Sequence, residues 1–395
     1  MGIELTNGQI YTIYDLEDWW HHSTRQTFEI SGPPGSGKTT MIRYFIERIG
    51  LDLDDVLFIA YMGKAASQMS RHGLPARTAH SACYLCEKVV SKDENGKMIF
   101  LPNGKVKTEY QFILRDKLPN KPKLIVIDEG FMMPEKNAVD ILSFGVPTVV
   151  LGDINQLPPV FGKPYFLQNP DAILTEIMRQ KEGDPIIYLS QELLKGNDLK
   201  EGVYGNSAVM RKENLTDYQL KRADAIITCT NRLRGYINNL FREKFLDLYS
   251  LEYPNYGEKI ICRKNNWGKS IKDHGELYLN NGLLGYVDWV SRESYTSKNI
   301  KIDFRPDFTT KSFKNLSISI PYITTPPGKN SEIYVPPGTE SFEYGYALTC
   351  HLMQGSEADD VVFLKEDNFF GNKRDYQRLL YTAVTRAKTS IKYVY

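Results

Sequence analysis

Four short apolar runs, rich in β-branched residues, recur through the first 151 residues, and each ends just before a polar motif. They are TFEI (27–30), VLFIAY (56–61), LIVI (124–127) and PTVVL (147–151). Continuous apolar runs of this length suit strands that are buried on both faces of a parallel sheet. Open sheets of this kind bind ligands at the carboxyl ends of their strands. We therefore expect one α/β domain over much of residues 1–182.

The rest of the chain changes character twice. A second α/β part is indicated by AIITCT (225–230), a basic helix (231–245), DDVVFL (359–364) and IKYVY (391–395). Between residues 257 and 337, short strands alternate with turn residues, which is the spacing of a small antiparallel barrel. Asn-Gly pairs at 95–96 and 103–104 predict a β-hairpin that interrupts the first domain.

Composition limits the class of protein. The chain has 395 residues and a net charge of +1, so a nucleic-acid partner would need a local basic groove. Five cysteines are an odd number for a disulfide framework, and Cys83-x-x-Cys86 has no second pair at zinc-site spacing. No run approaches the length of a spanning helix, and the first residues are polar. We expect a soluble, reduced, intracellular protein of the cytoplasm, without a membrane partner.

GPPGSGKTT lies between the first apolar run and a helical stretch, which is the context that a phosphate-binding loop requires. The loop comprises Gly32, Pro33, Pro34, Gly35, Ser36, Gly37, Lys38, Thr39 and Thr40. Its backbone N–H groups and the following helix N-terminus can hold phosphates. Lys38 would reach the β- and γ-phosphates of ATP, and Thr39 would coordinate Mg²⁺.

Two further motifs complete a nucleotide site. Asp128 ends the run LIVI and suits Mg²⁺ coordination, while Glu129 suits the base that polarises the attacking water. Gln156 follows the fourth run and could contact the γ-phosphate. Because phosphoryl transfer spreads negative charge, an arginine from a second element can raise the rate about 10³–10⁵-fold. The candidates are Arg179 and Arg386.

Six motifs in one order carry a resemblance. The phosphate loop and the Asp-Glu pair are followed by GDINQLPPV (152–160), EIMRQ (176–180), YALTCHLMQGSE (346–357) and LYTAVTRAK (380–388). In this order the chain resembles the superfamily 1 helicases, in the RecD-like/Dda-like group (superfamily 1B). The resemblance implies two RecA-like domains with Mg-ATP in the cleft between them. It also implies movement from 5′ to 3′ along single-stranded DNA.

The resemblance implies an α/β fold class: two RecA-like, parallel-sheet P-loop domains with an inserted β-hairpin (pin) and an inserted SH3-like β-barrel. NNGLLGYV (280–287) resembles part of that barrel. The expected boundaries are 1–82 with 118–182 for domain 1A, 83–117 for the pin 1B, 183–256 with 338–395 for domain 2A, and 257–337 for the barrel 2B.

Further site residues are carried over from the family by position. For the nucleotide they are Gln9 at the adenine edge, Gly355, and Glu357 near the ribose. For the DNA strand they are Met62, Lys64, Thr78, His80, Thr349, His351 and Gln354. One departure is that the family's usual Pro-Thr pair is Tyr61-Met62 here.

Aromatic residues could add stacking platforms for bases. Tyr84 and Tyr236 are candidates, each with packing or surface exposure as the alternative. Phe100 in the hairpin is a candidate wedge for separating strands, and packing against its parent domain is the alternative.

We therefore predict a DNA helicase that hydrolyses ATP, acts as a monomer on single-stranded and forked duplex DNA, and is of the kind found in phages and bacteria. Replication, recombination or repair would be its setting, with proteins of replication or recombination as partners. An RNA-directed helicase of the same superfamily and an ATP-driven remodeller that strips or loads proteins on DNA remain alternatives. A simple P-loop kinase would leave Gln156, Arg386 and the second α/β part unexplained.

Overall fold

A computed structural model describes residues 5–61, 63–71, 73–100, 104, 106, 108–159, 163–176, 183–273, 276–292, 294, 296–367 and 372–395. Contacts divide the chain into two compact units. The first comprises Met1–Ile154 with Pro158–Ile177, and the second comprises Asn155–Leu157 with Met178–Tyr395. Within the described residues, no helix is both long enough and apolar enough to cross a membrane.

The first unit is built on a parallel sheet with the strand order β3-β2-β6-β7-β1-β8. Its strands are β1 (Thr27–Ser31), β2 (Val56–Ala60), β3 (Ala76–Thr78), β6 (Leu124–Asp128), β7 (Thr148–Gly152) and β8 (Ala172–Ile173). Its helices are α1 (Asn7–His22), α2 (Lys38–Arg48), α3 (Gly63–Arg71), α4 (Ala79–Cys83) and α5 (Glu135–Leu142), with 3₁₀ turns at Leu53–Asp55 and Gly130–Met132. The four apolar runs form β1, β2, β6 and β7, so the predicted parallel-sheet core is confirmed.

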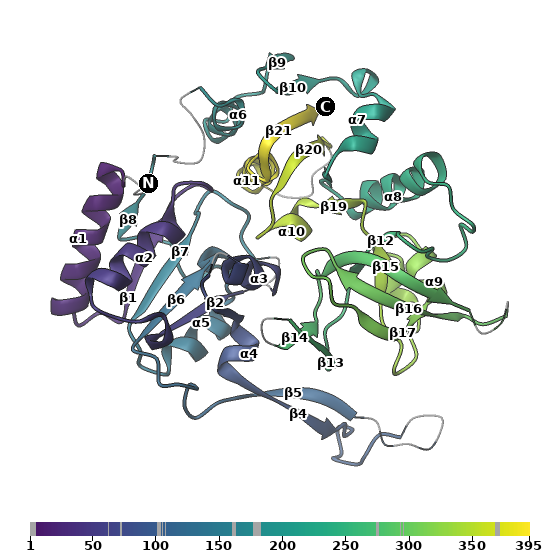
Figure 1. Ribbon diagram of the computed structural model, residues 1–395, viewed down its shortest axis with the longest axis horizontal. Coiled ribbons are helices and arrows are strands. Elements are labelled where there is room, and N and C mark those ends of the chain that lie inside the picture. The colour runs from purple at the N-terminus through teal and green to yellow at the C-terminus, as the bar shows by residue number, and fades with distance from the viewer. Residues whose placement is uncertain are drawn as a thin grey trace. The chain divides into compact units, whose positions relative to one another are not determined.

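Helices cover both faces of this sheet (Figure 1). Successive strand residues contribute to different cores: Phe58 packs with α1, α2 and α3, while Ile59 packs with α4 and α5. Because neighbouring side chains in a strand point to opposite faces, a strand covered on both sides is apolar along most of its length, as β2 and β7 are. This explains why the runs show no alternation.

An antiparallel ribbon of β4 (Tyr84–Val90) and β5 (Thr108–Leu114) extends away from the first sheet (Figure 1). Beyond Val90, single bridges join Lys92 to Met98 and Phe100 to Val106. Gly96 and Gly104 have positive φ angles, as the predicted Asn-Gly turns require. The pairing agrees with a hairpin, and its identity as the helicase pin remains a prediction.

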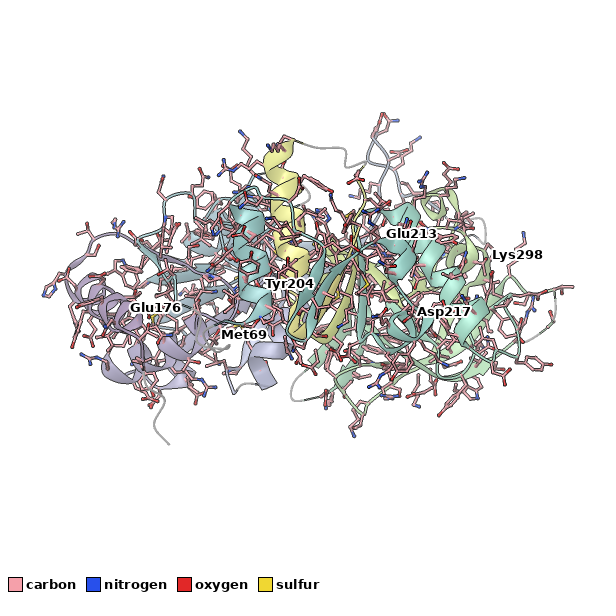
Figure 2. The ribbon with its side chains drawn as sticks, turned by 90° about the horizontal axis from the view of Figure 1, so that it is seen from above. Met69, Glu176, Tyr204, Glu213, Asp217 and Lys298 are labelled. Atoms are coloured by element: carbon pink, nitrogen blue, oxygen red, sulfur yellow. The ribbon has the colours of Figure 1, made fainter. Side chains whose placement is uncertain are left out.

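The second unit contains a sheet with the strand order β19-β11-β20-β21-β10-β9, parallel except for β9. Its strands are β9 (Gly202–Tyr204), β10 (Ser207–Met210), β11 (Ala225–Thr228), β19 (Ala347–Thr349), β20 (Ala358–Leu364) and β21 (Ala387–Val394). Its helices are α6 (Pro185–Leu194), α7 (Asp217–Arg222), α8 (Asn231–Phe245), α10 (Cys350–Met353) and α11 (Lys373–Val384), with a 3₁₀ turn at Lys212–Asn214. Tyr204 of the edge strand β9, labelled in Figure 2, stacks on Tyr188 of α6 with 5.7 Å between ring centroids.

An antiparallel sheet with the order β17-β16-β15-β12-β18 is inserted between α8 and β19 (Figure 1). Its strands are β12 (Lys259–Cys262), β15 (Leu284–Ser291), β16 (Asn299–Pro306), β17 (Phe313–Ser319) and β18 (Phe342–Tyr344). A small ribbon of β13 (Asn266–Lys272) and β14 (Glu276–Leu279), the helix α9 (Ile320–Thr324) and a 3₁₀ turn at Asn330–Glu332 complete the insertion. A bridge from Ile318 to Glu340 links the β17 edge to the chain entering β18 at the other edge. The sheet thus curls toward closure, and its identity as an SH3-like barrel remains a prediction.

Candidate nucleotide and strand-binding sites

The phosphate loop begins where β1 ends. The Gly32 N–H donates to the carbonyl of Gly152 at the end of β7 (3.0 Å), which fixes the loop's first residue to the sheet. Gly35 and Gly37 have φ angles of 81° and 74°, in the left-handed region that favours glycine. Gly37 is also the N-cap of α2, so the loop turns directly into a helix N-terminus.

Lys38, the first residue of α2, folds back across the loop. Its ammonium donates to the carbonyls of Gly32 (2.6 Å) and Pro33 (3.0 Å). The Ser36 hydroxyl is buried and has no hydrogen-bond partner among the described residues. A cation, an uncommitted buried hydroxyl and a helix N-terminus therefore meet in one loop, and this donor set fits the phosphates of a nucleotide. Thr39 and Thr40 are half-buried in the first turn of α2.

Gln9 connects α1 to the same loop. Its amide oxygen accepts from the Thr6 N–H (2.9 Å), and its amide nitrogen donates to the Ser36 carbonyl (2.9 Å). The side chain is 2% exposed. Both ends of the amide are thus engaged with the backbone, so Gln9 braces the phosphate loop. Its contact with adenine remains a prediction.

Asp128 and Glu129 stand at the carboxyl end of β6, and β7 lies between β6 and β1. Glu129 has a φ of 53° and a ψ of 38°, a left-handed conformation that costs a non-glycine residue about 1–2 kcal/mol. The Glu129 N–H donates to Asp128 Oδ1 at 3.0 Å. The tight turn redirects Glu129 where the strand ends, and such strain concentrates at functional sites. Asp128 and Thr39 are the residues that would hold Mg²⁺.

Glycine is required where this turn meets β7. A Cβ on Gly130 would lie 2.2 Å from Val150 Cγ1, and a Cβ on Gly152 would lie 2.5 Å from Leu167 Cδ1. The same Gly152 Cβ would lie 3.3 Å from the backbone nitrogen of Phe131. The two glycines therefore let the turn after β6 pack directly against the end of β7.

The segment after β7 changes unit: Asn155–Leu157 belongs to the second unit by its contacts. Gln156 is 3% exposed. The Leu157 N–H donates to Thr382 Oγ1 (3.0 Å), and the Leu157 carbonyl accepts from Gln354 Nε2 (2.9 Å). The sequence places Gln156 among the motifs of the first domain, so the hydrogen bond from the next residue, Leu157, to Thr382 is a contact that the motifs did not reveal.

Arg386 is 2% exposed and lies after α11. Its guanidinium donates to the carbonyls of Thr382 (3.1 Å) and Ser356 (3.2 Å) and to Thr385 Oγ1 (3.4 Å). The side chain is therefore oriented by its own unit. The second candidate arginine, Arg179, lies outside the described residues.

Two of the predicted strand contacts occupy equivalent turns. Thr78 ends β3 and caps α4 by accepting from the Ser81 N–H (3.2 Å), and Thr349 ends β19 and caps α10 by accepting from the Leu352 N–H (3.4 Å). Both β3 and β19 are edge strands of six-stranded sheets. A histidine stands two residues after each threonine. Each unit thus carries one Thr-x-His turn at the carboxyl end of an edge strand.

Burial lowers the pKa of both histidines of these turns, His80 and His351, with Lys136 adding to the effect at His80. Both rings are therefore neutral at pH 7, and any contact that they make with a strand would use ring faces or hydrogen bonds rather than positive charge. His80 stacks on Tyr84 (5.4 Å between centroids) and meets the edge of Phe112 (4.9 Å).

Tyr84 is a packing residue, which corrects its candidacy as a base-stacking platform. It is 4% exposed, and its phenol donates to Asp140 Oδ2 at 2.6 Å. Tyr236 is 64% exposed and Phe100 is 61% exposed. The exposure of Phe100 excludes the alternative in which it packs against its parent domain.

The remaining candidates for nucleotide and strand contacts differ in how far they are buried. Gln354 is 2% exposed, with its amide nitrogen engaged by Leu157 as above. Gly355 has a φ of 66°, and Glu357 is half-buried. Met62 and the Lys64 side chain lie outside the part of the chain that the structure describes.

Family comparisons agree with these features. A model of the AAA domain matches residues 20–162, and a model of the UvrD-like helicase C-terminal domain matches residues 344–391. The chain is 24% identical to an uncharacterized protein of Methanocaldococcus jannaschii over 91% of its length. It spans only 36% of that relative.

The fold is similar to those of solved Pif1 helicases. A Bacteroides Pif1 in complex with ADP-AlF3 and single-stranded DNA is 17% identical with a TM-score of 0.53, covering 99% of this chain and 92% of that one. Pif1 from Candida albicans is 16% identical with a TM-score of 0.52, covering 99% and 94%. A Pif1 structure from a study of unwinding at forked DNA is 18% identical with a TM-score of 0.55, covering 99% and 92%. At these identities the likeness shows a shared fold.

The ordered motifs, the two family matches and the shared fold lead to one conclusion: the chain is similar to the superfamily 1 helicases and has the fold of the Pif1 helicases.

Proposed function

We propose that the chain is an ATP-dependent DNA helicase that moves from 5′ to 3′ on single-stranded DNA and unwinds duplex DNA. The observation that carries the proposal is the pair of Thr-x-His turns, one at an edge strand of each sheet. A simple nucleotide hydrolase needs a phosphate loop but has no use for a second unit with a matching turn. A motor that holds one strand with two units needs both.

Nucleotide use follows from the loop. Lys38, the buried Ser36 hydroxyl and the N-terminus of α2 supply donors for phosphates, and Thr39 with Asp128 would hold Mg²⁺. When bound, Mg²⁺ would supply positive charge that offsets the charge developing on the phosphates. Glu129 would then polarise the attacking water, and Arg386 would stabilise the transferred phosphoryl.

DNA is the proposed track because the similar Pif1 structures include complexes with single-stranded DNA and a study of forked DNA. The single-stranded contacts would come from Thr78, His80, Thr349 and His351, with Met62, Lys64 and Gln354 as further candidates. Phe100, exposed beyond the β4–β5 ribbon, is the proposed wedge. We further propose that the boundaries of domains 1A, 1B, 2A and 2B are those expected from the sequence. We also propose that the protein acts as a monomer in replication, recombination or repair.

The first test is ATP hydrolysis with and without matched DNA and RNA oligonucleotides. The proposal predicts that DNA stimulates hydrolysis and that Lys38→Ala abolishes the stimulated rate. Lys38→Ala should bind the DNA strand about as tightly as the parent, because Lys38 contacts the phosphate loop. Equal or greater stimulation by RNA would overturn the assignment of DNA as the track.

A further inference from the structure

The backbone N–H, the backbone carbonyl and the side chain of Leu157 all have partners in the second unit. Its side chain is 2% exposed in the apolar core that α6 and α11 share with the second sheet. Its N–H donates to Thr382 Oγ1 (3.0 Å), and its carbonyl accepts from Gln354 Nε2 (2.9 Å). The residue directly before it is Gln156, the proposed reader of the γ-phosphate. The segment that carries Gln156 is therefore anchored one residue downstream.

Thr382 provides the central link of this anchor. It is 0% exposed, and its hydroxyl donates its single proton to the Arg378 carbonyl (2.7 Å). The hydroxyl oxygen is thus left to act as acceptor for the Leu157 N–H. The backbone carbonyl of Thr382 accepts from Arg386 Nε (3.1 Å) and from Thr385 Oγ1 (3.0 Å). One buried residue therefore contacts both the Gln156 segment and the candidate catalytic arginine.

We propose that Thr382 is a positioning residue for ATP hydrolysis, whose hydroxyl holds the Gln156 segment in a fixed place relative to Arg386. This rests on the proposed function, in which Gln156 reads the γ-phosphate and Arg386 stabilises the transferred phosphoryl. Both groups act on the same few atoms, so their relative placement decides whether they act together. A displacement of about 1 Å can cost about 10²-fold in rate.

The side chain has a specific requirement. Valine would fill the same space as Thr382 but would offer no acceptor, which would leave the Leu157 N–H buried without a partner. Serine would keep the hydroxyl and lose only a methyl group. The carbonyl that binds Arg386 belongs to the backbone and survives both changes. Thr382→Val therefore releases the Gln156 segment while it leaves the Arg386 contact in place.

The test compares Thr382→Val with Thr382→Ser and with Thr228→Val as matched control. Thr228 is also 0% exposed and in the second unit, and its hydroxyl bonds to the carbonyls of Thr230 (3.2 Å) and Leu348 (3.4 Å) rather than to Leu157 or Arg386. We expect Thr382→Val to lower the kcat of DNA-stimulated hydrolysis about 10–100-fold, with KM for ATP and the Kd for an oligonucleotide changed by less than about twofold. Thr382→Ser and Thr228→Val should retain kcat within about twofold.

A double-mutant cycle with Gln156→Ala tests the route of the effect. If Thr382 acts through the Gln156 segment, Thr382→Val should add little to the loss already caused by Gln156→Ala. Multiplicative losses in the double variant, or equal kcat values in Thr382→Val and Thr228→Val, would overturn the role of Thr382.

Hydrogen exchange gives a readout that does not depend on activity. The amide of Leu157 should be protected in the parent and in Thr228→Val, and should exchange faster in Thr382→Val. An unchanged exchange rate would contradict the anchor itself. A parent protein that does not hydrolyse ATP in response to DNA would overturn the proposed function. If the parent is active and Thr382→Val leaves its kcat unchanged, only this inference is overturned.

Discussion

Glu29 places a carboxylate within β1, between β7 and β8 of the first sheet. Burial raises its pKa, and the hydrogen bond from the Leu167 N–H (2.6 Å) opposes that rise. The nearby Asp171 raises the pKa further, while Arg25, which pairs with Asp171 at 2.8 Å, lowers it. Because the folded state binds this proton more tightly than the unfolded chain, the contribution of Glu29 to stability is most favourable at low pH. It falls as pH rises from the ordinary glutamate pKa through the raised value.

Glu29→Gln should therefore raise the free energy of unfolding at pH 7 and change this free energy least in acid. Glutamine keeps an oxygen for the Leu167 N–H and cannot ionise. The measurement is the unfolding free energy of both proteins in urea between pH 4 and pH 7. Glu243 is exposed, so Glu243→Gln serves as control. Its free energy of unfolding should equal that of the parent at each pH. A stability gap that shrinks as pH rises would contradict the burial argument.

At the scale of elements, buried ion pairs join α8 to the inserted antiparallel sheet. Arg242 of α8 pairs with Glu258 at 2.6 Å, with both side chains at most 5% exposed, and its guanidinium lies 3.9 Å from the ring centroid of Tyr344. Arg234, two turns earlier, pairs with Glu343 of β18 at 2.7 Å. Because a buried charge without its partner is costly, these contacts fix the helix and the sheet to each other.

Arg242→Ala should lower the free energy of unfolding by about 3–5 kcal/mol, because it leaves Glu258 buried without its partner. The matched control is Lys244→Ala on the same helix, which breaks an exposed pair with Asp217 (2.7 Å) and should cost less than about 1 kcal/mol. Asp217 is labelled in Figure 2. Urea unfolding of both variants decides the question. Similar costs for the two would show that the buried pair does not join the elements.

The β4–β5 ribbon is the second element with a separable role. If Phe100 stacks on an opened base pair, Phe100→Ala should slow duplex unwinding about tenfold, since stacking is worth about 1–3 kcal/mol per base. Its DNA-stimulated ATP hydrolysis should be unchanged. Met98→Ala is the control, because Met98 lies on the same hairpin and is 54% exposed but has no ring. Equal unwinding by both variants would exclude Phe100 as the wedge.

Across the whole molecule, local patterns predicted the fold better than they predicted the contacts of the site. The apolar runs identified β1, β2, β6 and β7 because burial on both faces leaves a signal within five residues. The basic stretch NRLRGYINNLFREKF became α8 with the expected bounds. By contrast, the hydrogen bond from Leu157 to Thr382 joins residues 225 positions apart. Nothing in either motif encodes that contact, and the burial of Tyr84 likewise depends on its distant partner Asp140.

The central claim is that the two units together form a motor that moves from 5′ to 3′ and opens duplex DNA. The measurement that tests it most directly is strand separation on duplexes that carry a single-stranded tail on the 5′ side, the 3′ side or neither, with ATP and Mg²⁺. The account predicts that the 5′-tailed duplex is unwound, that the other two are not, and that Lys38→Ala unwinds none of them. Preferential unwinding of the 3′-tailed duplex would contradict the proposed 5′-to-3′ direction. ATP-driven displacement of streptavidin from the strand without unwinding would contradict the claim that the motor opens duplex DNA.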